Sequence, residues 1–187
     1  MLVPKGAFVS SPEHLPTHLE IIQSHTKTEG EANMTEERKE LMDYVENVEG
    51  LSWIRGGGPT SRSWNGIQYK IGLSGKNTNA KELSMNVASV PPGAVAYAHI
   101  HDQFEVMLFI LRGHVRHEYG PNLEHAVEHE AGDFIFIEPG VPHEVFNISE
   151  SEPVVAVVAR STADEWDKII DYPSQTRERD GVPPQKQ

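Results

Sequence analysis

The stretch from Gly93 to Gly113, GAVAYAHIHDQFEVMLFILRG, decides the fold of this chain. Alternate residues of a strand face the same side, so His99 and His101 project from one face of a strand. Glu105 follows four residues later, close enough to return to that face across a tight corner. Two neutral imidazoles and one carboxylate form the ligand set of non-haem iron and related divalent sites. The stretch therefore predicts two strands that carry a metal site.

Short strand candidates also flank this stretch on both sides. Turn residues such as Gly113, Gly120, Gly132 and Gly140 separate them, and no helical pattern intervenes. Such spacing is typical of an antiparallel sandwich or barrel. The strands are expected at residues 67–71, 83–90, 95–101, 104–111, 114–119, 133–138, 144–148 and 154–160.

A second stretch, GDFIFIEPGVPHEVFN from Gly132 to Asn147, supplies a further ligand candidate. His143 follows Pro139 and Gly140, a turn that can aim the first residue of the next strand inward. Tyr97 shares the parity of His99 and is expected to line the same interior. The sequence thus predicts three imidazoles and one carboxylate inside the barrel.

Together the two stretches resemble the paired motifs of the cupin family. Gly93, His99, His101 and Glu105 match the family's first motif, and Gly113 closes it after seven residues instead of six, which we attribute to a bulge. The second motif is matched by Gly132, Gly140, His143 and Asn147, whereas Glu138 stands where the family has proline. The similarity covers roughly residues 83–160.

The resemblance implies an all-β fold, an antiparallel double-stranded β-helix (jelly-roll or cupin barrel), here with an N-terminal helical extension and a short C-terminal helix. It also implies that His99, His101, Glu105 and His143 bind one divalent metal ion, with Fe(II) preferred and Mn(II), Ni(II) or Zn(II) also accepted. Glu105 is expected to act as a catalytic base as well. Gln103 is expected either to act as a catalytic residue, through contact with the substrate or with one of the metal ligands, or to be an exposed corner residue.

Three functions follow from such a site. The first is an Fe(II) dioxygenase or related oxidoreductase that acts on a small organic substrate with O₂. The second is a redox-neutral isomerase, decarboxylase or lyase that acts on a sugar or hydroxy acid through a Lewis-acidic metal. The third is a non-enzymatic module that binds a small molecule. Cupin barrels commonly pair through exposed sheet faces, so we also expect a homodimer.

Composition excludes several classes of protein and of binding partner. The 187 residues include no cysteine, which excludes disulfide scaffolds and thiolate sites. The net charge of −12 argues against nucleic acid and anionic membranes as partners. No apolar stretch predicts a membrane span or a signal peptide, so a cytoplasmic protein is expected. Of the ten histidines, we interpret a second group as solvated surface residues: His114, His117, His125 and His129.

The chain divides into three predicted regions. Residues 1–50 form an arm and a helix, in which Met34, Leu41, Tyr44 and Val48 follow helical spacing up to Gly50. Residues 51–172 form the barrel and include a short closing helix at 163–170. Residues 173–187, rich in proline and mixed charges, are expected to be a flexible tail.

Overall fold

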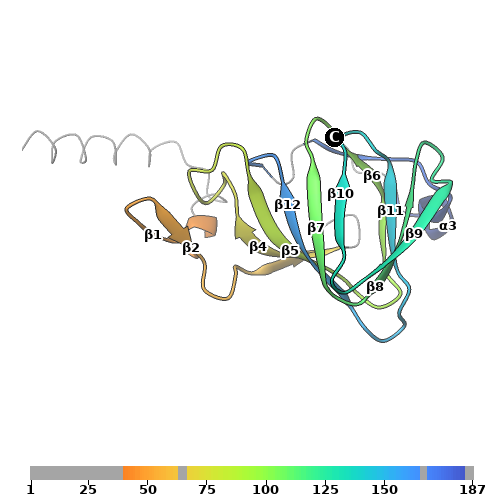
Figure 1. Ribbon diagram of the computed structural model, residues 1–187, viewed down its shortest axis with the longest axis horizontal. Helices are drawn as coiled ribbons and strands as arrows, with labels where there is room; N and C mark the ends of the chain where they lie inside the picture. Colours follow the sequence, from red (N-terminus) through yellow and green to blue (C-terminus); the bar gives the residue numbers. More distant parts are fainter. Residues whose placement is uncertain (1–39, 63–66, 165–167, 184–187) are drawn as a thin grey trace, which may run out of the picture. The chain divides into compact units, whose positions relative to one another are not determined.

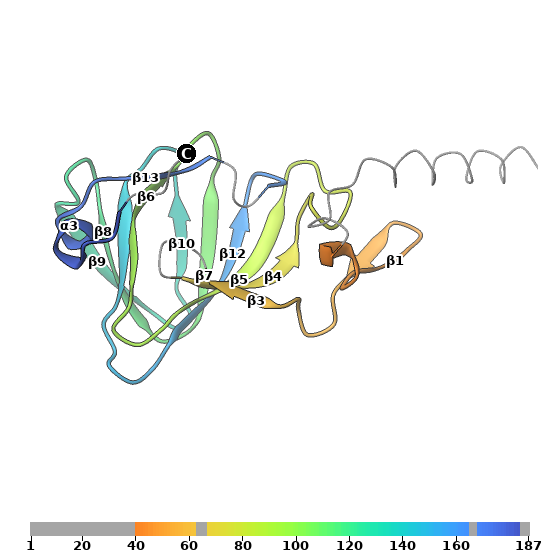
Figure 2. The same cartoon turned by 180° about the vertical axis from the view of Figure 1, so that it is seen from behind.

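The computed structural model describes residues 40–62, 67–164 and 168–183, with the side chains of 61 and 62 left out of the description. Two large antiparallel sheets face each other and enclose the core (Figures 1 and 2). The six-stranded sheet has the order β10-β7-β12-β5-β4-β3, and the five-stranded sheet has the order β13-β6-β11-β8-β9. This arrangement confirms the predicted antiparallel double-stranded β-helix.

The strands of the six-stranded sheet and of the five-stranded sheet have the following bounds. In the first sheet they are β3 (Thr60–Arg62), β4 (Gln68–Leu73), β5 (Ser84–Val90), β7 (Val106–Arg112), β10 (Phe134–Ile137) and β12 (Val154–Arg160). In the second they are β6 (Val95–His101), β8 (His114–Tyr119), β9 (His125–Glu130), β11 (His143–Asn147) and β13 (Ile169–Asp171). A separate hairpin pairs β1 (Glu46–Val48) with β2 (Leu51–Trp53).

Alternating burial along the strands explains the two-layer arrangement. In β12, Val154, Ala156 and Val158 are buried while the residues between them are half-buried. Their neighbours on β5 and β7, including Ala88 and Ile110, are buried with them. One face of the sheet therefore packs inward against the other sheet, as expected for antiparallel sheets with one covered face.

Gly113 joins β7 to β8 in a conformation that a larger residue would not adopt. Its φ is 95°, and an added Cβ would come within 2.8 Å of the Pro153 carbonyl oxygen. The bulge predicted before it is present, because Val155 pairs with Arg112 and Ala156 pairs with Ile110, which leaves Leu111 as an extra residue on β7.

The helix predicted to end at Gly50 is wrong over most of the described residues. Only residues 40–42 are helical, and Glu46–Val48 is a strand. Glu49 and Gly50 both have positive φ, 49° and 89°, which is the conformation of a two-residue hairpin turn. The candidate apolar face is not buried, since Tyr44 and Val48 are exposed. The rest of the predicted arm, residues 1–39, lies outside the described residues.

The C-terminal predictions also need correction. Residues 169 and 170, expected to end a helix, belong to β13, which pairs with β6. A helix, α3 (Gln175–Asp180), instead lies within the segment predicted to be flexible. The Ser174 side chain accepts a hydrogen bond from the Arg177 amide at the N-terminus of α3, and Gly181 at φ 66° ends the helix. In the described part of the chain, no helix has the length and apolar content to cross a membrane.

Candidate metal centre

Three histidines meet on the inner face of the five-stranded sheet. His99 and His101 are alternate residues of β6, and His143 of β11 pairs directly with His99. One ring nitrogen from each lies within 4.8 Å of the others, and all three side chains are buried. The ring centroids of His99 and His143 are 4.3 Å apart, and each lies within 5.0 Å of the His101 centroid. The predicted convergence of these imidazoles is present.

Backbone carbonyls fix the orientation of two of the rings. His99 Nδ1 lies 2.8 Å from the carbonyl oxygen of Tyr97, and His143 Nδ1 lies 2.9 Å from that of Val141. Because a carbonyl oxygen only accepts hydrogen bonds, both Nδ1 atoms carry the proton. The Nε2 atoms of these two rings therefore have the free lone pair that a metal ligand needs.

The three imidazoles are held in the neutral form. Burial lowers the pKa of His99 well below its usual value, and the nearby His143 lowers it further. Burial, followed by the neighbouring His99 and His143, also lowers the pKa of His101. For His143 burial is again the main cause of a lowered pKa. A metal ion thus meets ligands that do not have to lose a proton first.

These observations show that the donor set suits a divalent metal ion. His101 Nδ1 is buried and has no hydrogen-bond partner among the described residues. The His101 ring stacks on Phe104 at a centroid distance of 5.0 Å, which restrains its orientation. Imidazole donors accept Zn(II), Fe(II), Ni(II) and related ions. His99, His101 and His143 are the residues that would hold such an ion.

Glu105, the predicted fourth ligand and base, does not join this cluster. Its side chain is exposed, whereas its neighbours Phe104 and Val106 are buried. Its amide donates to the Ser161 hydroxyl at 2.9 Å, which holds the backbone with the side chain on the outer face. The bulge at Leu111 lies too far along β7 to change this alternation. The family motif has six residues between this ligand and the closing glycine. Six residues, 107–112, separate Val106 from Gly113, so the motif position falls on Val106, and this spacing is the signal against Glu105.

Gln103 is an exposed corner residue, one of the two alternatives that the sequence leaves open. It adopts a positive φ of 68° in the turn between β6 and β7. Its amide nitrogen donates to Asp102 at 3.1 Å, and its amide oxygen accepts from the Lys168 ammonium at 3.1 Å. The left-handed turn directs this side chain to the surface, so the catalytic role predicted for Gln103 has no structural basis.

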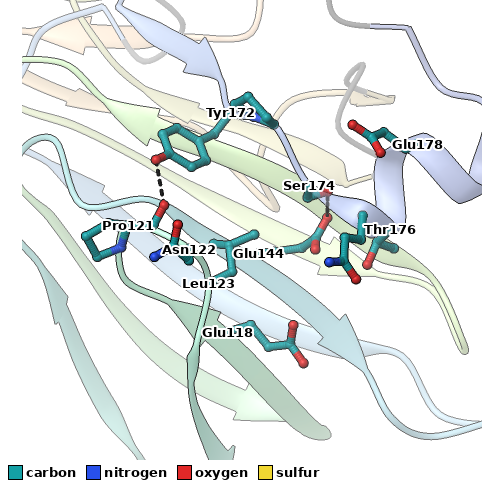
Figure 3. Close-up of a pocket in the computed structure, with 11 residues that line it drawn as sticks. Glu118, Pro121, Asn122, Leu123, Glu144, Tyr172, Ser174, Thr176 and Glu178 are labelled. Carbon is teal, nitrogen blue, oxygen red and sulfur yellow. Dashed lines mark hydrogen bonds between the residues drawn. The ribbon is translucent and has the colours of Figure 1, made fainter.

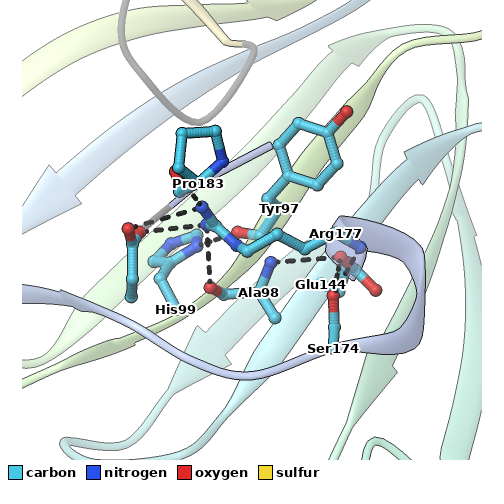
Figure 4. A network of polar contacts seen from close by, with 8 residues as sticks. Tyr97, Ala98, His99, Glu144, Ser174, Arg177 and Pro183 are labelled. Atoms are coloured by element: carbon cyan, nitrogen blue, oxygen red, sulfur yellow. Dashed lines mark hydrogen bonds and ion pairs between the residues drawn. The ribbon is translucent and has the colours of Figure 1, made fainter. Parts of the chain in front are cut away.

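Tyr97 faces the opposite side from the one predicted. His143 pairs with His99 but Val145 pairs with Ala96, so β6 has one extra residue between them. This bulge reverses the alternation, and the Tyr97 ring packs under the Arg177 guanidinium at 5.2 Å (Figure 4). The Tyr97 hydroxyl donates to Asp180 at 3.2 Å. Parity counting alone could not reveal the bulge.

Two further histidines line a cavity beside the cluster. His117 of β8 is buried and His129 of β9 is half-buried, with their rings 5.1 Å apart. Both line a cavity of about 460 Å³ whose wall also includes His143. Their interpretation as solvated residues is therefore wrong, although it holds for the exposed His114 and His125. In β8 the alternation of Val115, His117 and Tyr119 was the available signal for an inward face.

The outer face of the same sheet is covered by α3. Glu144 accepts hydrogen bonds from the Ala98 amide at 3.2 Å and the Ser174 hydroxyl at 2.9 Å, and burial raises its pKa (Figure 4). A second cavity, of about 620 Å³, lies beside α3 and is lined by Glu144, Glu118 and Tyr172 but by none of the three clustered histidines (Figure 3). It therefore lies apart from the metal centre.

Comparisons with known proteins agree with this fold. Residues 86–160 match the family model described as a cupin domain. No curated protein shows significant sequence similarity to this chain.

Several solved structures share the fold at low sequence identity. The oxalate decarboxylase of Lactobacillus farciminis, solved as a formate complex, has a TM-score of 0.56 at 17% identity, over 74% of this chain and 43% of that chain. A predicted oxalate decarboxylase from Thermotoga maritima has a TM-score of 0.51 at 18% identity, over 60% and 99%. The Streptomyces protein PAC13, solved with uridine, has a TM-score of 0.51 at 13% identity, over 65% and 89%. At these identities the similarity shows the fold alone.

Proposed function

The chain belongs to the cupin superfamily, and we propose that it is a metal-dependent enzyme that acts on a small organic substrate. One observation carries the proposal: three buried, neutral imidazoles gather their ring nitrogens within 4.8 Å, and one of them, that of His143, lines a cavity. A core built only for stability would fill these positions with apolar side chains, because a buried polar atom without a partner is costly.

The residues around the cluster supply what such an enzyme needs. The carbonyls of Tyr97 and Val141 hold two of the rings in one tautomer. When bound, a divalent ion would supply Lewis acidity and, in the case of Fe(II), redox chemistry with O₂. The adjoining cavity of about 460 Å³ is within the size range of small-molecule sites.

Fe(II)-dependent dioxygenation is the activity that we place first. The imidazole donors suit Fe(II), and the absence of cysteine leaves no thiol to be oxidised at the site. Redox-neutral isomerase, decarboxylase or lyase chemistry is the second candidate, favoured by the exposed position of Glu105. Without that carboxylate an ion on three neutral imidazoles retains its full double charge and attracts anionic substrate groups more strongly.

Elemental analysis of untagged protein, paired with the His101→Ala variant, tests the proposal. We expect about one transition-metal ion per wild-type chain and almost none in the variant. Turnover of a panel of hydroxy acids and phenols is then compared in air and without O₂. Loss of turnover without O₂ supports the dioxygenase, whereas unchanged turnover supports the redox-neutral reaction. A chain that binds no ion, even after refilling with Fe(II), would contradict the proposal, and one that binds the ion but turns nothing over would support a binding module.

The homodimer expected from the sequence also stays a proposal. Met85, Met107, Phe134 and Phe136 are exposed on the six-stranded sheet, and apolar patches of this kind often mark protein contacts. We infer that a second copy of the chain covers them. A monomeric mass by light scattering at micromolar concentration would contradict this assembly.

A further inference from the structure

The cavity beside the three histidines combines six apolar lining residues with five that carry polar groups. Its polar side chains come from β8, β9, the β10–β11 turn and the start of β11, and its apolar ones come mainly from β10. The apolar lining includes Val127, Ile135, Ile137 and Val141, with Phe134 and Phe136 at its edge. Neither lysine nor arginine is among the described residues that line it. Such a wall suits a compact apolar molecule and offers no cation to pair with a phosphate.

His117 is the polar residue of this cavity that the protein leaves unsatisfied. Its side chain is only 6% exposed, and its buried Nδ1 has no hydrogen-bond partner among the described residues. The nearest aromatic contact is the ring of His129 at 5.1 Å, in an edge-on arrangement that is not a hydrogen bond. A buried polar atom without a partner lowers stability, so its presence calls for a ligand that completes it.

The His117 imidazole is neutral, because burial and the nearby His143 and His129 lower its pKa to about 3. A neutral imidazole offers one N–H donor and one lone-pair acceptor. It therefore pairs with a hydroxyl or a carbonyl group without needing a charged partner. His143 lies on the wall of the same cavity, so one small molecule in the cavity is close to both residues.

We propose that His117 is a substrate-binding residue that forms a hydrogen bond with a hydroxyl or carbonyl group of a small ring-bearing, mainly apolar molecule. The inference rests on the proposed function, because it places that molecule beside the metal centre. It also narrows the substrate class, since the described lining residues offer no cation to a phosphorylated or highly charged molecule and leave the metal ion as its single positive partner. Glu138 on the same wall further disfavours anionic groups at this side of the cavity.

A pair of matched probes tests the role of His117. 2-Naphthol carries a hydroxyl that naphthalene lacks, and the fluorescence of both reports binding to the Zn(II)-loaded protein. For His117→Phe we expect the affinity for 2-naphthol to fall about tenfold, the effect of losing one buried hydrogen bond. Naphthalene binding should change by less than about twofold, because the apolar wall is kept. His117→Gln, which retains a donor and an acceptor, should recover most of the loss.

Controls separate this result from other causes. His125→Phe replaces an exposed histidine of the neighbouring strand and should leave both affinities unchanged. An equal loss for both probes in His117→Phe would mean that the residue only shapes the cavity, which overturns the inference. Failure of wild-type protein to bind 2-naphthol would overturn the substrate class. Elemental analysis of each variant is independent: a lack of metal in all of them would contradict the proposed function, while the probe result would still decide the role of His117.

Discussion

The two faces of the five-stranded sheet differ sharply although adjacent residues build them. His143 points inward to two other imidazoles, and the next residue, Glu144, points outward to α3. On the outer face Glu144 has the Ala98 amide and the Ser174 hydroxyl as partners, and Arg177 forms an ion pair with Asp171 at 3.0 Å (Figure 4). On the inner face, Nδ1 of His101 and of His117 have no partner among the described residues.

The two faces therefore differ in the source of their hydrogen-bond partners. The protein supplies them on the outer face, and a ligand would supply the missing ones on the inner face. On the outer face Glu144 and Asp171 find partners within the fold, as buried polar groups usually do, and of Arg177 only Nε lacks one among the described residues. The inner face departs from that rule at His101, in the histidine cluster, and at His117, which lines the cavity, as expected for a functional site whose partner is not part of the chain. The outer face should therefore control stability, and the inner face should control binding.

Acidification gives the largest effect that distinguishes the two faces. Burial lowers the pKa of four histidines: His99, His101, His117 and His143. Below about pH 6.5 these side chains are therefore protonated in the unfolded chain but stay neutral in the folded chain. Stability is thus fully present above pH 6.5 and falls as the pH drops, by about 1.4 kcal/mol per pH unit for each histidine. Burial raises the pKa of Glu144, and this carboxyl group acts in the opposite direction.

Urea unfolding of the metal-free protein between pH 7.5 and 5 measures this slope. In the His117→Phe variant, this slope should correspond to about one proton fewer taken up on unfolding, because one of the four buried histidines is absent. A stability that is flat across this range would mean that the inner histidines are solvated, and would remove the contrast between the faces.

Arg177→Ala should give the next largest effect, on the outer face. The variant removes the buried guanidinium that pairs with Asp171, and we expect a loss of about 3 kcal/mol in the free energy of unfolding. Arg179→Ala is the matched control, because Arg179 pairs with Asp180 in solvent and should cost less than about 0.5 kcal/mol. Metal content should be unchanged in both, and a loss of metal in Arg177→Ala would show that the faces are coupled.

Ser174→Ala should cost less, about 1–2 kcal/mol. The Ser174 hydroxyl accepts from the Arg177 amide at 3.0 Å and donates to Glu144 at 2.9 Å, so the change removes the helix cap and one partner of a buried carboxyl group. Chemical denaturation measures the loss. A cost as small as that of Arg179→Ala would show that the hydrogen bonds of Ser174 do not stabilise the packing of α3 on the outer face.

His117→Phe in the metal-free protein should have the smallest effect and the opposite sign. Removing an unpaired buried polar atom while keeping a ring should raise the free energy of unfolding at pH 7.5 by about 1 kcal/mol. A thermal melt beside the wild type detects this gain. A clear loss of stability would indicate that His117 is a satisfied core residue.

The successes of the sequence analysis come from patterns that repeat locally. Alternation along β6 places His99 and His101 on one face, and the second motif adds His143. Apolar alternation also predicts β6, β8 and β12 with the same bounds as in the structure. These features depend on neighbouring residues and on turn chemistry, which a sequence states directly.

The errors arise where a local count does not determine which face a residue occupies. The bulge in β6 turns Tyr97 outward, and the exposed position of Glu105 depends on how the chain leaves the corner before β7. The burial of His117 depends on β10, a strand of the opposite sheet that lines the same cavity. For α3, by contrast, Ser174 and Gly181 were readable end signals that the prolines around them obscured.

The central claim is that three imidazoles, without Glu105, form the metal centre. Elemental analysis after refilling with Fe(II) and gel filtration should compare wild type, His143→Ala and Glu105→Gln. The wild type and Glu105→Gln should each retain about one ion per chain, and His143→Ala should retain less than about a tenth of one. Loss of the ion in Glu105→Gln to the level of His143→Ala, or its retention in His143→Ala, would contradict the claim.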